Sequence, residues 1–134
     1  MWTSFVTQRL VPTAALLLAL LAAPPAWADR MCELPASVTG RICPVEVCIA
    51  LQIEVNTVGM GRLGCNKISG CSALKAMRQK WLDYYVARSR INVVCWGGGD
   101  EGHQIAAAQA IEQVTVCDGR IALPEPVGCA NPCP

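Results

Sequence analysis

The chain has 134 residues, a formal net charge of +1 and nine cysteines. This length is enough for one small domain, and the near-neutral charge argues against a protein that binds polyanions through net charge alone. The cysteine content argues against an ordinary cytosolic protein, in which thiols stay reduced.

The first 28 residues have the pattern of a secretory signal peptide. A short start containing Arg9 precedes an apolar stretch over residues 10–23, and Ala-Trp-Ala at 26–28 matches a cleavage site. The apolar stretch is too short for a membrane span and is interrupted by proline. We therefore expect residues 29–134 to form a mature protein that is secreted or periplasmic, carries ten basic and ten acidic residues, and has no membrane anchor.

All nine cysteines follow the predicted cleavage site. In an exported chain this density predicts up to four disulfides, and the odd cysteine predicts a free thiol or an intermolecular disulfide. Zinc is disfavoured because the spacings form no paired C-x2-C set and one histidine cannot complete a Cys2His2 site. The disulfide candidates are Cys32, Cys43, Cys48, Cys65, Cys71, Cys95, Cys117, Cys129 and Cys133.

Residues 29–64 are expected to form a cysteine-containing loop and strand region. Apolar side chains alternate with others from Val45 to Val55, and this period of two is typical of a β strand or one arm of a hairpin. Asn56 and Gly59 mark the turn that would follow.

Two helices are predicted next. A first helix begins after Ser72 as N-cap, continues to Cys95 with a 3.6-residue period, and ends at the glycine run 97–99. Asp100 is the expected N-cap of a second helix that ends at Asp118-Gly119; a β-hairpin across this Asp-Gly pair is the alternative.

The predicted fold is therefore small, disulfide-rich and mainly α, an antiparallel helical hairpin with an N-terminal β strand or hairpin, in the α+β class. Residues 118–134 would be a Cys/Pro-rich tail stapled as a loop. The hairpin geometry favours a Cys71–Cys117 disulfide, whereas an early end of the first helix would favour Cys95–Cys117.

Charge is distributed unevenly along the chain. Residues 62–90 carry seven basic side chains and one acidic side chain, whereas residues 95–134 carry five acidic side chains and one basic side chain. Two interpretations are open: the two segments pack against each other, or the basic segment presents a face for phosphate.

The segment from Gly97 to Gln104 is the strongest candidate for chemistry, because it contains the only histidine, two carboxylates and a glycine run. We expect His103 to be a neutral base, since the positive end of a helix dipole disfavours imidazolium. The exposed amides of Gly98, Gly99 and Glu101 are expected to form an anion cradle at the helix N-terminus. The candidate catalytic residues are His103, Asp100, Glu101 and Arg88, and the candidate phosphate contacts are Gly97, Gly98, Gly99 and Arg90.

These residues suit metal-independent cleavage of RNA, with Asp100 orienting the imidazole and Glu101 or a lysine as the acid. No cofactor is expected, although a divalent metal held by Asp100, Glu101 and His103 is a second route. The simpler interpretation is that the glycines end one helix, Asp100 caps the next, and His103 bonds to a neighbouring backbone carbonyl.

The motif Ala-Arg-x-x-Ile-Asn-x-x-Cys-x-Gly-Gly-Gly-Asp-x-Gly-His-Gln-x-Ala, over residues 87–106 and closing at Cys117, resembles the bacterial polymorphic-toxin family called novel toxin 16. The resemblance covers residues 65–117, a toxin-like helical-hairpin domain about half as long as the mature chain. It implies a toxin or effector with nuclease activity, and therefore nucleic acid or an immunity protein as partner. The predicted signal peptide departs from the usual setting, in which the domain ends a large exported toxin.

A second hypothesis comes from another class of protein. The chain would then be a non-enzymatic, disulfide-stapled secreted module that binds a protein or an envelope component. The neutral mature charge, the few aromatic residues and the absence of a second histidine favour it.

Overall fold

The structure is a computed structural model that describes residues 31–130. The predicted signal peptide and Cys133 lie outside these residues. Three long helices make up most of the fold, and between residues 31 and 130 there is no strand, only an isolated bridge between Pro124 and Ala130. The elements are α2 (Ala36–Thr39), α3 (Val45–Gly59), the 3-10 helix η2 (Cys65–Lys67), α4 (Cys71–Trp96) and α5 (Glu101–Ile121).

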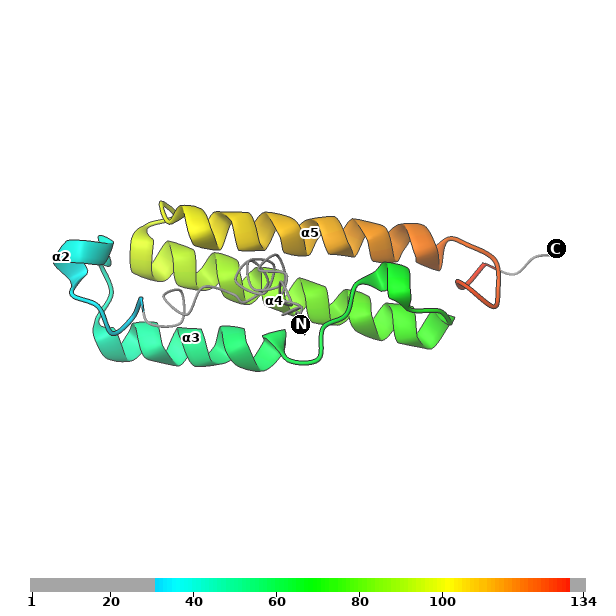
Figure 1. Ribbon diagram of the computed structural model, residues 1–134, viewed down its shortest axis with the longest axis horizontal. Helices are drawn as coiled ribbons and strands as arrows, with labels where there is room; N and C mark the ends of the chain where they lie inside the picture. The colour runs from blue at the N-terminus through cyan, green and yellow to red at the C-terminus, as the bar shows by residue number, and fades with distance from the viewer. Residues whose placement is uncertain (1–30, 131–134) are drawn as a thin grey trace, which may run out of the picture.

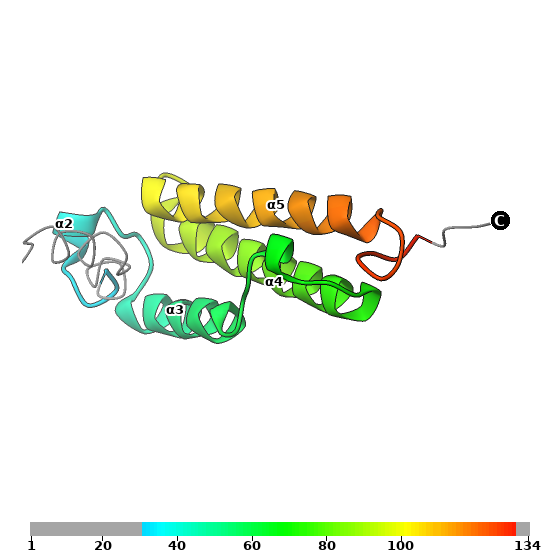
Figure 2. The ribbon, with the colours of Figure 1, turned by 45° about the vertical axis from the view of Figure 1, so that its right-hand side comes forward.

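Helix α4 lies at the centre of the molecule. It packs against α5 along one side and against α3 along another, and both views in Figures 1 and 2 show α4 between these two helices. The chain reverses direction between α3 and α4 and again between α4 and α5. The short η2 contacts both α4 and α5 near the end of the molecule that is opposite to α2.

The strand predicted over residues 45–55 is wrong, because this segment is helix α3. The alternating pattern concealed a helical one: the buried side chains are Cys48, Leu51, Gln52 and Val55, with the spacing of a single helix face. A lone strand would leave its backbone hydrogen-bonding groups without a partner sheet, whereas a helix satisfies them internally. The other apolar residues of the pattern, including Ile49 and Ile53, are exposed.

The predicted antiparallel hairpin of two helices is confirmed as α4 and α5, but the first helix begins, and the second ends, at other residues than predicted. Helix α4 begins at Cys71 with Gly70 as its N-cap, two positions before the predicted cap at Ser72. Helix α5 continues past Asp118-Gly119 to Ile121. The aspartate side chain pairs with Arg78 of α4 instead of marking the end of the helix.

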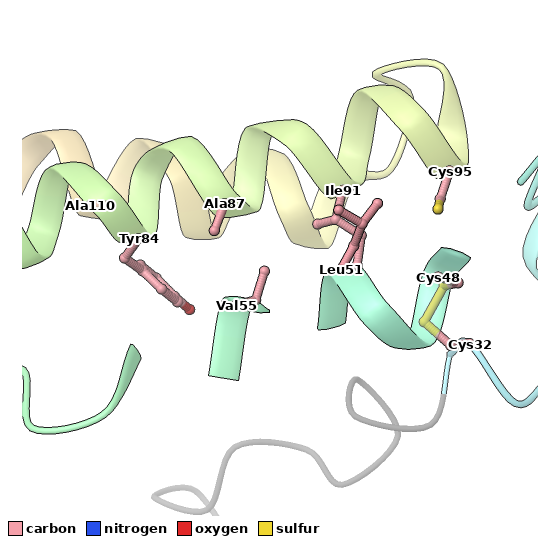
Figure 3. Close-up of a cluster of buried hydrophobic side chains, with 9 residues drawn as sticks. All are labelled: Cys32, Cys48, Leu51, Val55, Tyr84, Ala87, Ile91, Cys95 and Ala110. Carbon is pink, nitrogen blue, oxygen red and sulfur yellow. A yellow bond between two sulfur atoms is a disulfide. The ribbon is translucent and has the colours of Figure 1, made fainter. Parts of the chain in front are cut away.

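The main core lies between α3 and α4 (Figure 3). Leu51 and Val55 of α3 face Ala87 and Ile91 of α4, and Ile91 is completely buried. Tyr84 lies in the same cluster, which also includes Ala110 of α5. Residues before position 65 therefore share one core with the predicted toxin-like hairpin.

The eight cysteines between residues 31 and 130 form four disulfides, and the predicted Cys71–Cys117 pairing is wrong. The 3-10 helix η2 brings Cys65 against Cys117 on the last turns of α5, and Cys71 is bonded to the tail that follows α5. The structure therefore confirms that the tail is stapled, and it matches an oxidising compartment. The pairs are Cys32–Cys48, Cys43–Cys95, Cys65–Cys117 and Cys71–Cys129.

Three cysteine sulfurs converge at one end of α4, those of Cys43, Cys48 and Cys95, all within 4.8 Å of one another. This is the one group of potential metal ligands that residues 31–130 bring together. Each of these sulfurs is bonded to another sulfur, so none is a thiolate available to a metal. The group is best described as two disulfides packed against each other.

The uneven charge distribution corresponds in part to packing between the two segments. Arg78 of α4 pairs with Asp118 of α5, which joins the basic segment to the acidic one. Arg90 of α4 pairs instead with Glu54 of α3, at 3.2 Å. Among residues 31–130, no helix is both long and apolar enough to cross a membrane.

We predict that removing a disulfide lowers the free energy of unfolding according to the length of chain it closes. The pair Cys43–Cys95 closes 52 residues and Cys32–Cys48 closes 16, which corresponds to losses of about 4 and about 3 kcal/mol. Urea unfolding of the Cys43→Ala/Cys95→Ala and Cys32→Ala/Cys48→Ala variants measures both. A smaller loss for the first variant than for the second would contradict this connectivity.

Candidate functional site

The glycine run joins α4 to α5 by a tight turn. Gly97 has a φ of 58° and Gly98 a φ of 86°, in the left-handed region that only glycine adopts without strain. The amide of Gly97 donates to the carbonyl of Val93, and the amide of Gly98 donates to that of Asn92. These bonds satisfy the last carbonyls of α4, so two of the glycines form a helix C-cap.

Asn92 holds this turn from inside α4. Its side chain is 6% exposed; its Nδ2 donates to the carbonyl of Gly98 and its Oδ1 accepts from the amide of Asp100. Asn92 was not among the predicted site residues, although it belongs to the Ile-Asn-x-x-Cys part of the motif. A polar side chain one turn before a glycine run was the available signal.

Asp100 is the N-cap of α5, as predicted. Its Oδ1 accepts a hydrogen bond of 2.9 Å from the backbone amide of His103, which satisfies one free donor of the first helical turn. Glu101, the first residue of α5, is exposed and favoured there by the helix dipole. The carboxylate of Asp100 is therefore engaged in capping and does not contact the imidazole ring of His103 within hydrogen-bond distance.

The backbone amides of the three glycines, which were expected to contact a phosphate, already have partners within the turn. The amides of Gly97 and Gly98 donate to carbonyls of α4, and the amide of Gly99 donates to the carbonyl of Trp96 at 2.9 Å. Amides that already donate within the turn are not available to a phosphate.

His103 lies at the joint between the two helices and is only 5% exposed. It comes from the first turn of α5 and packs against the end of α4, with its ring 4.9 Å from that of Trp96. Trp96 in turn donates from its indole nitrogen to the carbonyl of Thr39 at the end of α2. The histidine therefore links α5 to α4 and, through Trp96, to the N-terminal segment.

Arg88 determines which ring nitrogen of neutral His103 carries the proton. Its Nη1 lies 3.3 Å from Nδ1 of His103, and because a guanidinium can only donate, Nδ1 is the acceptor and a neutral ring carries its proton on Nε2. Burial, and secondarily the charge of Arg88, lower the pKa of His103 below 6.5, against a smaller opposite effect of Asp100. The lowered pKa agrees with the neutral imidazole that the sequence predicted. The unprotonated nitrogen of that ring, Nδ1, already accepts a hydrogen bond from Arg88.

The remaining candidate residues do not converge on this histidine. Arg90 points to α3, where it pairs with Glu54. Asp100, Glu101 and His103 do not form a group of potential metal ligands in the described part of the chain. Of the predicted catalytic set, the structure places Arg88 and His103 in side-chain contact, and Asp100 beside them as a cap.

Arg88 also connects His103 to an aromatic and cationic cluster that the sequence did not indicate. Its Nε donates to the hydroxyl of Tyr84 at 2.9 Å, and the guanidinium of Arg62 lies 3.1 Å above the centre of the same tyrosine ring. Arg62 also lies 4.6 Å from the ring of Trp81. Because Arg62 lies 22 positions before Tyr84 in the sequence, no local pattern could have revealed the contact.

Two adjoining pockets open around this cluster. The first, of about 280 Å³, lies between α3 and α4 and is lined by both arginines, Tyr84 and Asn56. The second, of about 460 Å³, lies toward α5 and shares Arg62 and Tyr84 with the first.

Comparison with family models, with curated proteins and with solved structures finds no match to this chain. The resemblance to novel toxin 16 therefore stays a prediction that depends on the motif around the glycine run.

We predict that Asn92→Ala lowers the free energy of unfolding by about 2 kcal/mol, because it deletes two hydrogen bonds and leaves the amide of Asp100 without its partner. Chemical denaturation measures the loss, with the exposed Asn66→Ala as control. A loss no larger than that of the control would show that Asn92 does not hold the turn.

We predict that the free energy of unfolding decreases on acidification because of His103. Its pKa is lowered in the folded protein, so as the pH falls below 6.5 the unfolded chain binds a proton that the native protein does not, and stability decreases until the folded pKa is passed. Urea unfolding at pH 7.5 and 5.5 measures this decrease.

The control for this prediction is His103→Asn, whose side-chain oxygen can still accept from Arg88. Because the chain has one histidine, we expect the decrease between these two pH values to be smaller in the variant. Equal decreases in the two proteins would contradict a buried neutral His103.

Proposed function

We propose that the chain is an exported, disulfide-stapled module that binds a partner without catalysing a reaction. Four disulfides in a domain of this size hold the three helices in a fixed arrangement, and this favours a rigid binding surface. Together with the signal peptide predicted from the sequence, they support a secreted or periplasmic location. A preorganised surface binds at a lower entropic cost than a flexible one.

One observation carries this proposal, the contact between Arg88 and His103. A general base must present a free lone pair to the proton that it removes. In His103 the unprotonated nitrogen, Nδ1, faces Arg88, and the ring is 5% exposed. Since Asp100 caps α5 through the amide of His103, Asp100 and His103 support a structural role better than a catalytic one.

The competing proposal is a toxin or effector with nuclease activity, as the resemblance to novel toxin 16 implies. The same contact favours it in one respect: a guanidinium beside a neutral histidine could neutralise a phosphate next to a base if the pair separated on binding. The partners would then be nucleic acid and an immunity protein, whereas the binding module would take a protein or an envelope component.

Nuclease activity distinguishes the two proposals. The full chain is exported in bacteria, purified with its disulfides formed, and incubated with RNA and with DNA beside its His103→Ala variant. We expect neither protein to degrade either nucleic acid. Expression of residues 29–134 in a strain with an oxidising cytoplasm should likewise leave growth unchanged.

A wild type that is toxic and degrades nucleic acid, with a folded His103→Ala variant that does neither, would refute the binding module. Circular dichroism and thiol titration of both proteins ensure that a loss of activity is not a loss of structure.

A further inference from the structure

We propose that the pocket between α3 and α4 binds the phosphate group of a small organic phosphate, and that the adjoining pocket toward α5 holds the organic part. The inference rests on the proposed function, and it adds a small-molecule ligand to the protein or envelope component that the binding module would take. The two pockets meet at Arg62 and Tyr84.

Charge is the first reason. Arg62 and Arg88 both line the smaller pocket and both lie against Tyr84, at 3.1 and 5.2 Å from its ring centre. Neither guanidinium has a carboxylate partner within residues 31–130, where the ion pairs are those of Arg78 and Arg90. Two half-buried cations that share one pocket repel each other, and a dianion between them would remove this repulsion.

The unused donors are the second reason. Arg62 donates from Nε to the carbonyl of Gly59, but its Nη1 is buried and has no hydrogen-bond partner. Arg88 uses Nε for Tyr84 and Nη1 for His103, which leaves Nη2 for a ligand. Planar guanidinium groups with free N–H donors match the oxygens of a phosphate.

The adjoining pocket supplies the third reason. Gln113 of α5 lines it, and its Oε1 is the other buried polar atom without a partner in the described part of the chain. Arg62 and Gln113 both line this pocket, and a ligand that accepts from Arg62 and donates to Gln113 would satisfy both buried atoms once the two side chains turn toward it. An organic phosphate with an N–H or O–H group has both properties, and Trp81 and Gln109 add further contact area.

Isothermal titration calorimetry of the exported, oxidised full chain at low ionic strength tests the proposal. The probes are inorganic phosphate, adenosine 5′-monophosphate, and adenosine as the probe without phosphate. We expect the first two to bind at a single site, the nucleotide more tightly, and adenosine not to bind at the same concentrations. Absence of binding by both phosphate-containing probes would overturn the proposal.

The variants locate the site. Arg62→Gln and Arg88→Gln should each weaken phosphate binding by about tenfold or more, since each removes a charge-assisted contact. Lys75→Gln, which removes the same charge from an exposed position on α4, should bind as the wild type does. An equal loss in the lysine variant would mean attraction by net charge and would overturn the pocket assignment.

Asn56→Asp keeps the proposal testable if an arginine variant fails to fold. The new carboxylate can still accept the 2.9 Å hydrogen bond from Gln52, so the fold should persist, and it places a negative charge in the smaller pocket. We expect phosphate binding to be lost while the melting temperature is retained or raised. A folded Asn56→Asp protein that binds phosphate as the wild type does would contradict the proposal.

Gln113→Leu tests the organic part separately. We expect it to weaken binding of the nucleotide and to leave binding of inorganic phosphate unchanged. Unchanged nucleotide binding would overturn the assignment of the adjoining pocket. Failure of the proposed function is distinguishable from all these outcomes, because it would appear as nuclease activity and not in the calorimetry.

Discussion

The arrangement of the whole molecule depends on covalent attachment at the two ends of α4. The first residue of this helix, Cys71, is bonded to the tail after α5, and its next-to-last residue, Cys95, is bonded to the segment before α3. Each end has a second disulfide nearby, Cys65–Cys117 at one and Cys32–Cys48 at the other. A domain this small has a limited core, so crosslinks that restrict the unfolded chain supply a large part of its stability.

This attachment explains why polar and charged side chains can be buried or half-buried between the helices. Arg62, Arg88 and His103 come from three different segments and meet around Tyr84 and Trp96. Grouping two guanidiniums near a neutral imidazole opposes folding, and the helices and disulfides around them hold the group together. The same rigidity leaves a buried donor on Arg62 and a buried acceptor on Gln113 without partners, in two residues that line the larger pocket.

The sequence predicted what depends on local chemistry. The glycine run ends one helix and Asp100 caps the next, because left-handed backbone and a side-chain cap are properties of single residues. Helix α3 was missed because nearly every position from Val45 to Val55 is apolar or neutral. A strand-like alternation could therefore be read from the same residues whose helical spacing places one face in the core. The disulfide pairing and the contact of Arg62 with Tyr84 join distant segments, and no local pattern encodes them.

The connectivity of the disulfides is the central claim, and peptide mapping of the oxidised, exported protein under non-reducing conditions tests it most directly. Proteolysis followed by mass spectrometry should recover linked peptides for Cys43–Cys95 and Cys71–Cys129, the two bonds at the ends of α4, and for Cys65–Cys117 and Cys32–Cys48. A peptide linking Cys71 to Cys117 in the folded protein would contradict the account, because it would separate the tail from α4 and η2 from α5.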